Sequence, residues 1–251
     1  MKTEKRIKKI TQWIGDYAKK YDIQSLVVGV SGGIDSAVVS TLSARTGLPT
    51  YAVSMPIKQN PELHSRSQSH CQWLAKSFPN VTEVTMDLTP VFTAFQKVSK
   101  GYDSQLGYAN TRARIRMTAL YQIAQSVNGI VVGTGNKVED FGVGFFTKYG
   151  DGGVDISPIA DCMKTEVWDM GIELGVSMEI VDAAPTDGLW EDGRTDEDQL
   201  GMSYKRLERA MSLYYNGKNG KNEQERNDIA KYCEIRAKNL HKMLPIPVCK
   251  L

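Results

Sequence analysis

Residues 26–36 read Leu26-Val27-Val28-Gly29-Val30-Ser31-Gly32-Gly33-Ile34-Asp35-Ser36. The apolar run over 26–30 predicts a buried strand, and residues 36–46 predict a helix, so a tight glycine turn connects the two. Two adjacent glycines let backbone N–H groups point into one concavity, and the N-terminus of the following helix adds partial positive charge. The sequence therefore predicts an anion-binding loop at the end of a strand.

A carboxylate lies inside this predicted anion-binding loop. Asp35 would repel a bound phosphate unless a cation lay between them, so it implies Mg²⁺ bridging the carboxylate to a polyphosphate. The loop lacks the Gly-Lys-Ser/Thr ending of the Walker type. A glycine turn without function is the alternative, which the order of strand, loop and helix disfavours. The pattern resembles the pyrophosphate-binding loop of the ATP pyrophosphatase superfamily, whose members cleave ATP between the α and β phosphates.

The composition of the 251 residues argues against several classes of protein. Lys plus Arg number 31 and Asp plus Glu 29, a net charge of +2, so we expect no nucleic-acid partner. The four cysteines are scattered without a C-x-x-C pair, which is typical of reduced thiols in a cytosolic protein and argues against zinc. The charged N-terminus is no signal sequence, and no apolar run approaches the ~20 residues that cross a bilayer. We therefore expect a soluble, cytoplasmic protein without a membrane partner.

Predicted strands and helices alternate through the first half of the chain. Strands separated by helices imply a doubly wound α/β fold, a parallel sheet with helices on both faces. Ligands of such sheets bind at the carboxyl ends of the strands, where the strand order reverses, so we expect loop 31–36 and residues 133–136 to face one crevice. Strands are expected at 26–30, 50–55, 81–86 and 129–133, and helices at 4–21, 36–46, 61–77, 88–99 and 108–127.

The second half of the chain does not continue the alternation of strands and helices. Glycines crowd residues 142–153, which cannot be regular helix or strand throughout. Helical patterns return at 164–174, 196–216 and 223–241, and the acidic stretch 182–198 looks like a mobile loop. We expect one domain over residues 1–251, with a C-terminal helical part at about 196–251.

Two motifs in this half of the chain indicate one family within the superfamily. They are Gly133-Thr134-Gly135-Asn136-Lys137-Val138-Glu139-Asp140 and Gly144-Phe145-Phe146-Thr147-Lys148-Tyr149-Gly150-Asp151-Gly152-Gly153-Val154-Asp155. With the glycine loop, they make nearly the whole chain resemble the ammonia-dependent NAD⁺ synthetases, and residues 145–153 are specific to that family among ATP pyrophosphatases. The resemblance implies a ligase that adenylates the nicotinate carboxylate of deamido-NAD⁺ with ATP, releasing pyrophosphate. Ammonia then displaces AMP to form NAD⁺.

The resemblance also implies roles for individual residues and an assembly. It implies a homodimer with the 108–127 helix in its interface, and catalysis by Asp35 and Glu139 through a shared Mg²⁺. The implied ATP contacts are Gly29, Val30, Ser31, Gly32, Gly33, Ile34, Asp35, Ser36, Thr134, Lys164 and Thr186. The implied deamido-NAD⁺ contacts are Arg114, Lys148, Asp155, His241 and Lys242.

The residue patterns alone assign fewer binding roles to these side chains than the resemblance does. Arg112 and Arg116 share a helix face, whereas Arg114 points about 200° round the axis. Without the resemblance all three would be solvated helix charges, and we expect Arg112 and Arg116 to meet solvent or carboxylates. Without the resemblance, a surface ion pair of little energetic consequence is the alternative for Lys148 and Asp155.

The remaining side chains of interest have no partner pattern. His64 and His70 stand alone in the sequence, and we expect both at the surface. Many bacterial relatives carry Gly-Thr-Asp-His-Ala-Ala-Glu where this chain has residues 133–139, so its threonine and glutamate are retained while the neighbouring loop differs.

Two other functions stay open at this point. One is another ATP pyrophosphatase, such as a tRNA-thiolating or GMP-forming enzyme, but thiolation needs reactive cysteines and a basic RNA face. The other is a non-catalytic nucleotide-binding sensor, which the intact pair of Asp35 and Glu139 opposes. The chain begins about one helix before the first strand, without the amidohydrolase domain of the glutamine-dependent members. We therefore expect free ammonia, or a separate donor, as the nitrogen source.

Overall fold

A parallel sheet forms the centre of the structure, a computed structural model that describes residues 1–186 and 195–250. Its four strands lie in the order β3-β2-β1-β4, so the strand order reverses between β1 and β4. The predicted doubly wound α/β fold is confirmed. The strands are β1 (Ser25–Gly29), β2 (Thr50–Ser54), β3 (Val81–Thr85) and β4 (Gly129–Val131).

The central strand β1 is buried on both faces, which explains its unbroken apolar run. Leu26 pairs with Thr50 of β2 on one side and with Ile130 of β4 on the other. Strand β4 is shorter than the predicted 129–133, although a parallel bridge between Val132 and Ile156 continues its direction. The register brings the carboxyl ends of β1 and β4 side by side.

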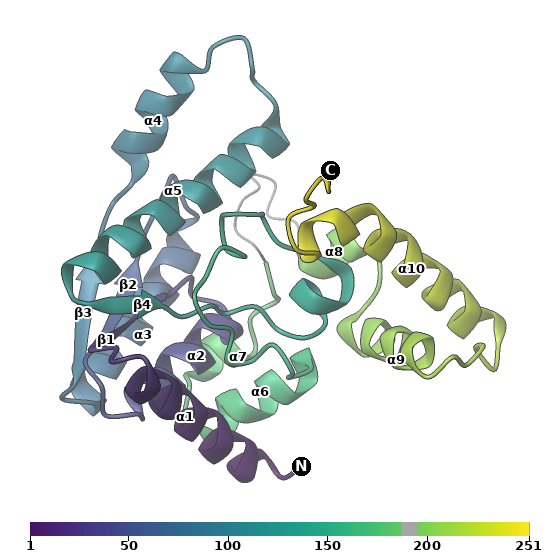
Figure 1. Ribbon diagram of the computed structural model, residues 1–251, viewed down its shortest axis with the longest axis horizontal. Coiled ribbons are helices and arrows are strands. Elements are labelled where there is room, and N and C mark those ends of the chain that lie inside the picture. The colour runs from purple at the N-terminus through teal and green to yellow at the C-terminus, as the bar shows by residue number, and fades with distance from the viewer. Residues whose placement is uncertain (187–194, 251) are drawn as a thin grey trace.

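Helices cover both faces of the sheet, as Figure 1 shows. On one face Leu26 and Val28 pack against Ile14, Val38 and Met170 of three helices. The opposite face, which includes Val27, packs against two others. The first face carries α1 (Thr3–Lys20), α2 (Ile34–Ala44), α3 (Pro61–Ser77) and α6 (Lys164–Glu173), and the second carries α4 (Thr89–Val98) and α5 (Gln105–Ser126).

The C-terminal helices form a hairpin on the opposite side of the molecule from the sheet (Figure 1). Its core joins Leu207, Met211 and Tyr232 to Val143 of a short π-helix. One helix was expected over 196–216, but Gly201, at φ 67°, ends α8 and a second helix begins after Ser203. Of the loop expected at 182–198, residues 187–194 lie outside the described residues. The elements are η1 (Glu139–Val143), α7 (Met178–Val181), α8 (Asp196–Leu200), α9 (Tyr204–Tyr215) and α10 (Glu223–Met243).

The four cysteines are free thiols. Burial raises the pKa of Cys71 to about 12 and that of Cys162 to about 11, which keeps both thiols protonated and unreactive at neutral pH. Across residues 1–186 and 195–250, every helix is too short or too polar to cross a lipid bilayer.

His70 lies in the core, so the expectation of a surface histidine is wrong. Its side chain on α3 is only 3% exposed, and its Nε2 lies 3.1 Å from the hydroxyl of Ser40 on α2. Burial lowers the pKa of His70 to about 4, because the interior disfavours the charged imidazolium. His70 shares the buried face of α3 with Ser67, Cys71 and Leu74, a mixed polar and apolar face that apolar periodicity does not identify.

His70 is expected to make the folded state sensitive to acid. Between pH 7 and pH 5 the histidine becomes protonated in the unfolded chain, where its pKa is near 6.5, but stays neutral in the folded protein. The free energy of unfolding should therefore fall by roughly 2 kcal/mol over this interval. Urea unfolding of the wild type and of His70→Gln at both pH values isolates the effect, because glutamine cannot protonate. An equal loss in the two proteins would assign the acid sensitivity to other groups.

Candidate active site

The glycine loop between β1 and α2 is held closed by its own serines. Gly32 has φ +89°, and a Cβ there would lie 2.6 Å from the carbonyl oxygen of Leu63, so only glycine fits. The Ser36 hydroxyl donates to the Gly33 carbonyl at 2.9 Å and accepts from the Ser31 N–H at 3.1 Å. Helix α2 begins without a side-chain cap, so a bound anion can take the place of the cap.

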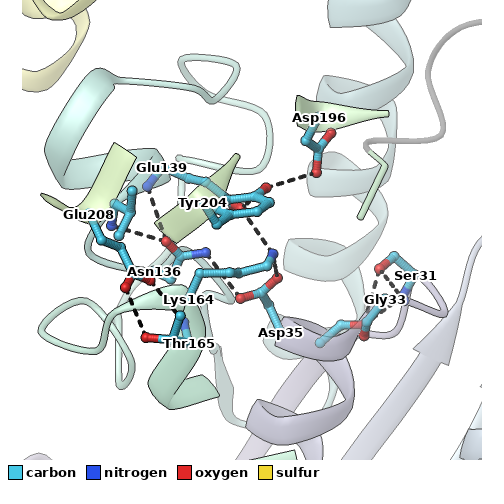
Figure 2. A network of polar contacts seen from close by, with 12 residues as sticks. Ser31, Gly33, Asp35, Asn136, Glu139, Lys164, Thr165, Asp196, Tyr204 and Glu208 are labelled. Carbon is cyan, nitrogen blue, oxygen red and sulfur yellow. Dashed lines mark hydrogen bonds and ion pairs between the residues drawn. The ribbon is translucent and has the colours of Figure 1, made fainter. Parts of the chain in front are cut away.

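Two carboxylates and one ammonium group meet beside this loop (Figure 2). Asp35 comes from the first turn of α2, Glu139 begins η1, and Lys164 begins α6. The Lys164 ammonium donates to Asp35 Oδ2 at 2.5 Å and to Glu139 Oε1 at 2.9 Å. The side-chain amide of Asn136 donates to Asp35 Oδ1 at 3.1 Å, and the Tyr204 hydroxyl donates to Glu139 Oε1. The expected crevice between loop 31–36 and residues 133–136 is thus present, with ionisable groups from both sides.

Burial and mutual attraction set the charges of this trio. Burial raises the pKa of Asp35 despite the neighbouring Lys164 ammonium. Burial also pushes the pKa of Glu139 upward, but Lys164 and the Tyr204 hydroxyl outweigh it, so that pKa ends below its usual value. For Lys164 burial acts to lower the pKa, yet the two carboxylates raise it well above normal. Lys164 is therefore charged, and Glu139 ionised, at neutral pH.

A further buried carboxylate, Asp140, lies near Asp35 and Glu139, and Asp151 lies near Asp140. Burial raises the pKa of Asp140 well above its usual value, and repulsion from Asp151, Glu139 and Asp35 adds to that. Burial also raises the pKa of Asp151. Such a pocket favours an additional cation with oxygen ligands.

The residues present fit Mg²⁺ on the chemistry of their donors. Asp35 and Glu139 offer carboxylate oxygens on either side of a single ammonium group. In the described part of the chain, no group of three or more His, Cys, Asp or Glu side chains is arranged to hold a metal ion. Magnesium suits this arrangement because it commonly binds through one or two carboxylates together with substrate phosphates and waters.

A second set of predicted residues lies around the loop of residues 145–153. Arg114 on α5 donates from Nε to the Lys148 carbonyl at 3.1 Å, and Lys242 on α10 donates to the Phe146 carbonyl at 2.7 Å. A Cβ on Gly152 would lie 2.3 Å from the Phe146 ring, so glycine allows this close packing. Arg114, Lys148 and Lys242, far apart in the sequence, are thus brought to one loop.

Asp155 has backbone and hydroxyl partners. Its carboxylate accepts from the Val131 N–H at 2.7 Å and from the Tyr121 hydroxyl at 3.0 Å. Burial and then the nearby carboxylate raise the pKa of Tyr121 to about 12. The Lys148 ammonium lies instead 5.5 Å from the centre of the Tyr149 ring, so the alternative surface ion pair between Lys148 and Asp155 does not form among the residues described.

Three other predicted residues lie outside these two groups. Thr134 is half-buried just beyond β4, and Thr186 is half-buried between α7 and α8 in the sequence. His241 is exposed on the last turn of α10. Of the remaining loop residues, Val30 and Ile34 are buried in the core and position the glycines between them.

Arg116, expected to meet solvent or carboxylates, has its charge attracted by the Asp151 carboxylate but donates its hydrogen bond to a backbone carbonyl. Its Nε donates to the Met55 carbonyl at 2.9 Å, because this face of α5 packs over the end of β2. Burial, then repulsion from Arg112, lowers the pKa of Arg116 to about 10. The guanidinium of Arg112 lies 5.3 Å from the centre of the Phe92 ring. The hydrogen bond from Arg116 thus joins α5 to the residue that follows β2.

Sequence reasoning missed three residues of this site. Asn136 is 0% exposed, and its Oδ1 accepts from the N–H groups of Val138 and Glu139, both at 3.0 Å. Its position three residues before Glu139 has the spacing of a helix cap, a signal available in the sequence. Tyr204 and Glu208 of α9 have a weaker signal, a glutamate beside the apolar stripe of an amphipathic helix.

Comparison with known proteins places these features in a family context. The sequence model of the family described as NAD synthase matches residues 6–245. An NH₃-dependent NAD⁺ synthetase of Carboxydothermus hydrogenoformans is 33% identical over 98% of both chains. Among solved structures, an NMN synthetase from Francisella tularensis has a TM-score of 0.88 at 30% identity, and an NH₃-dependent NAD synthetase from Campylobacter jejuni has 0.80 at 25%. Each of these two comparisons covers 100% of both chains.

Proposed function

The chain belongs to the NAD synthase family, and we propose that it amidates deamido-NAD⁺ to NAD⁺ with ATP and ammonia. The observation that carries this proposal is the meeting of Asp35, Glu139 and Lys164 beside the glycine loop, where β1 and β4 end. A site with an anion-binding loop, paired carboxylates and a buried ammonium suits chemistry on a polyphosphate. The intact pair of Asp35 and Glu139 argues against a sensor that has lost turnover.

The reaction proceeds in two displacements. A nicotinate carboxylate oxygen attacks the α-phosphorus of ATP, the bond to the bridging oxygen of the β-phosphate breaks, and pyrophosphate leaves. The ammonia nitrogen then attacks the acyl carbon, the bond to the AMP oxygen breaks, and the nitrogen loses a proton. Loop 31–36 and Lys164 bind the departing pyrophosphate, because backbone N–H groups and an ammonium offset its charge.

Asp35 and Glu139 are the residues that would hold Mg²⁺. When bound, the ion neutralises phosphate charge, which lets one anion approach another. Lys164 stays protonated beside the phosphates because its pKa is raised by the two carboxylates, even though burial opposes this. Asn136 keeps the Asp35 carboxylate oriented through its hydrogen bond.

We infer that the nucleotide carrying the carboxylate binds near Asp155 and the 145–153 loop. A cavity of about 660 Å³ opens there, next to Tyr121, whose hydroxyl donates to Asp155. Arg114 and Lys242 hold the loop from two sides, and Lys148 belongs to it. The cavity is lined by Met117, Thr118, Tyr121, Gln122, Gln125, Tyr149 and Gly153.

A second candidate function is amidation of nicotinate mononucleotide. The observation favouring it is the Francisella NMN synthetase structure, whose TM-score of 0.88 exceeds the 0.80 of the Campylobacter NAD synthetase. Both candidates use the same chemistry at the nicotinate carboxylate. They differ in whether an adenylyl group is bound beyond the reacting nucleotide.

One set of assays tests both functions. Purified protein with ATP, Mg²⁺ and ammonium is given deamido-NAD⁺ or nicotinate mononucleotide, and the amide, AMP and pyrophosphate are measured. We expect NAD⁺ and AMP in equal amounts, at a kcat/KM at least tenfold above that for the mononucleotide, and no product after EDTA treatment. The reverse preference would support the second candidate, and ADP as product would exclude both. Replacing ammonium with glutamine tests the nitrogen source.

We also propose a cytoplasmic homodimer. The apolar side chains of Val91, Phe95 and Val98 lie one turn apart on α4, and 52%, 42% and 83% of their surfaces are exposed. This stripe lies beside α5, so α4 and α5 together offer a surface for a second copy. Sedimentation at micromolar concentration should give twice the chain mass of 27.9 kDa, and a monomer would exclude the dimer. The free thiols, including exposed Cys249, suit a reducing compartment.

A further inference from the structure

Helix α9 contacts the candidate active site through two side chains that lie one turn apart. Tyr204 and Glu208 are four residues apart and therefore project from the same face of the helix. In Figure 2 Tyr204 reaches Glu139, and Glu208 reaches Thr165 at the start of α6. The C-terminal hairpin is thus in direct contact with η1 and α6, which present Glu139 and Lys164.

The Tyr204 hydroxyl orients Glu139. It donates to Oε1 of Glu139, the same oxygen that accepts from the Lys164 ammonium. Tyr204 is 1% exposed, so water cannot replace its hydroxyl if it is removed. With Oε1 engaged by two donors, the orientation of the carboxylate is fixed.

The Tyr204 ring makes a separate contact with Lys164. The ammonium lies 4.9 Å from the centre of this ring and 6.0 Å from that of Trp168. The two rings pack edge to face, 5.6 Å apart. Replacing tyrosine with phenylalanine removes the hydrogen bonds of the hydroxyl, to Glu139 and at 3.3 Å to Asp196 Oδ2, and leaves the contact between the ring and Lys164.

Glu208 fixes the helix turn from which Lys164 extends. Its carboxylate accepts from the Thr165 N–H at 2.9 Å and from the Thr165 hydroxyl at 2.8 Å. Thr165 follows Lys164 directly in the first turn of α6, where an anion is favoured by the exposed N–H groups. The backbone of Lys164 is thereby held to α9.

We propose that Tyr204 and Glu208 are positioning residues, through which α9 sets the orientations of Glu139 and Lys164. The inference rests on the proposed roles of those two residues toward a metal-bound nucleotide. Partners of metal ligands commonly change metal affinity 10- to 100-fold when removed. Helix α9 of the C-terminal hairpin then supports the nucleotide site through Glu139 and Lys164.

Binding without turnover tests this proposal. The probe is Mn²⁺ with α,β-methylene-ATP, which cannot be cleaved at the reacting position, and its Kd is measured by calorimetry. Tyr204→Phe should raise the Kd about tenfold or more. Tyr232→Phe is the matched control: it removes a buried hydroxyl from the same core cluster, one that donates to the Gly142 carbonyl at 3.2 Å and not to Glu139. This control should change the Kd less than threefold.

Glu208 is tested with the same probe. Glu208→Ala should raise the Kd several-fold, and Glu208→Gln, which keeps an acceptor for the Thr165 N–H, should recover part of the loss. Circular dichroism and thermal melts check that each variant is folded. Equal losses in Tyr204→Phe and Tyr232→Phe, or no loss in Tyr204→Phe, would overturn the positioning role. A wild type that does not bind the probe would instead overturn the proposed nucleotide site.

Discussion

Replacing Asp35 with asparagine is expected to lower kcat/KM for AMP formation by about 10³-fold, because one of two carboxylates proposed to hold Mg²⁺ loses its charge. The fold should survive. Burial already raises the pKa of Asp35, so loss of this buried charge relieves part of a desolvation cost, and Lys164 keeps Glu139 as its partner. Exchange of labelled pyrophosphate into ATP, in the presence of deamido-NAD⁺, measures the adenylation step alone.

Asp161→Asn is the matched control for this substitution. Asp161 is an exposed carboxylate that pairs with Lys137 at 2.6 Å, away from the trio. Its loss should leave pyrophosphate exchange within about twofold of the wild type, since exposed ion pairs contribute little. Retention of more than a tenth of the exchange rate by Asp35→Asn would remove Asp35 from the mechanism.

Replacing Lys164 with methionine is expected to have the largest effect on stability. The side chain is 2% exposed and its ammonium is shared by two buried carboxylates, so its removal leaves Asp35 and Glu139 facing each other. Breaking a buried pair in this way costs about 3–5 kcal/mol. For a chain of this length the Tm should fall by roughly 10 °C. Pyrophosphate release should be nearly abolished as well.

Adding Mg²⁺ distinguishes an electrostatic cause of the lower Tm of Lys164→Met from a packing defect. If Asp35 and Glu139 hold Mg²⁺, millimolar Mg²⁺ should restore several degrees of the Tm of Lys164→Met, because the ion replaces the missing positive charge. Lys137→Met removes the exposed ammonium that pairs with Asp161, and it should neither lower the Tm appreciably nor respond to Mg²⁺. A Lys164→Met protein that melts like the wild type would contradict the buried ion-pair account.

Local patterns predicted most of the fold. The four strands, and the helices α1 to α6 and α10, lie within a few residues of their expected ranges, because apolar periodicity and glycine or proline breaks are properties of short segments. The break between α8 and α9 was missed, since Gly201 ends a helix only when it adopts a left-handed conformation that the apolar pattern does not reveal. The π-helix η1 was missed for a similar reason. Its sequence, Glu139-Asp140-Phe141-Gly142-Val143, has no distinctive period.

The candidate site, like the fold, was predicted from the sequence only in part. Asp35 and Glu139 were predicted to meet because each follows a strand on either side of the reversal in strand order, and the structure confirms that they lie close together. His70 was expected at the surface because it has no partner pattern in the sequence, whereas α2 covers it in the folded chain. Arg116 was expected to meet solvent or carboxylates. Its charge is attracted by the Asp151 carboxylate, and the folded chain adds a hydrogen bond to the Met55 carbonyl that the sequence does not reveal.

The sequence by itself determined the order of strands and helices, the glycine turn after β1 and the family, because each depends on residues close together along the chain. Only the tertiary structure decided that Lys164, 129 positions from Asp35, lies between two carboxylates, and that α9 supplies the donor to Glu139. Such contacts depend on how distant helices pack, since a side chain's direction follows from the face of its helix that is buried. Burial then sets the charge of each group, which no local pattern contains.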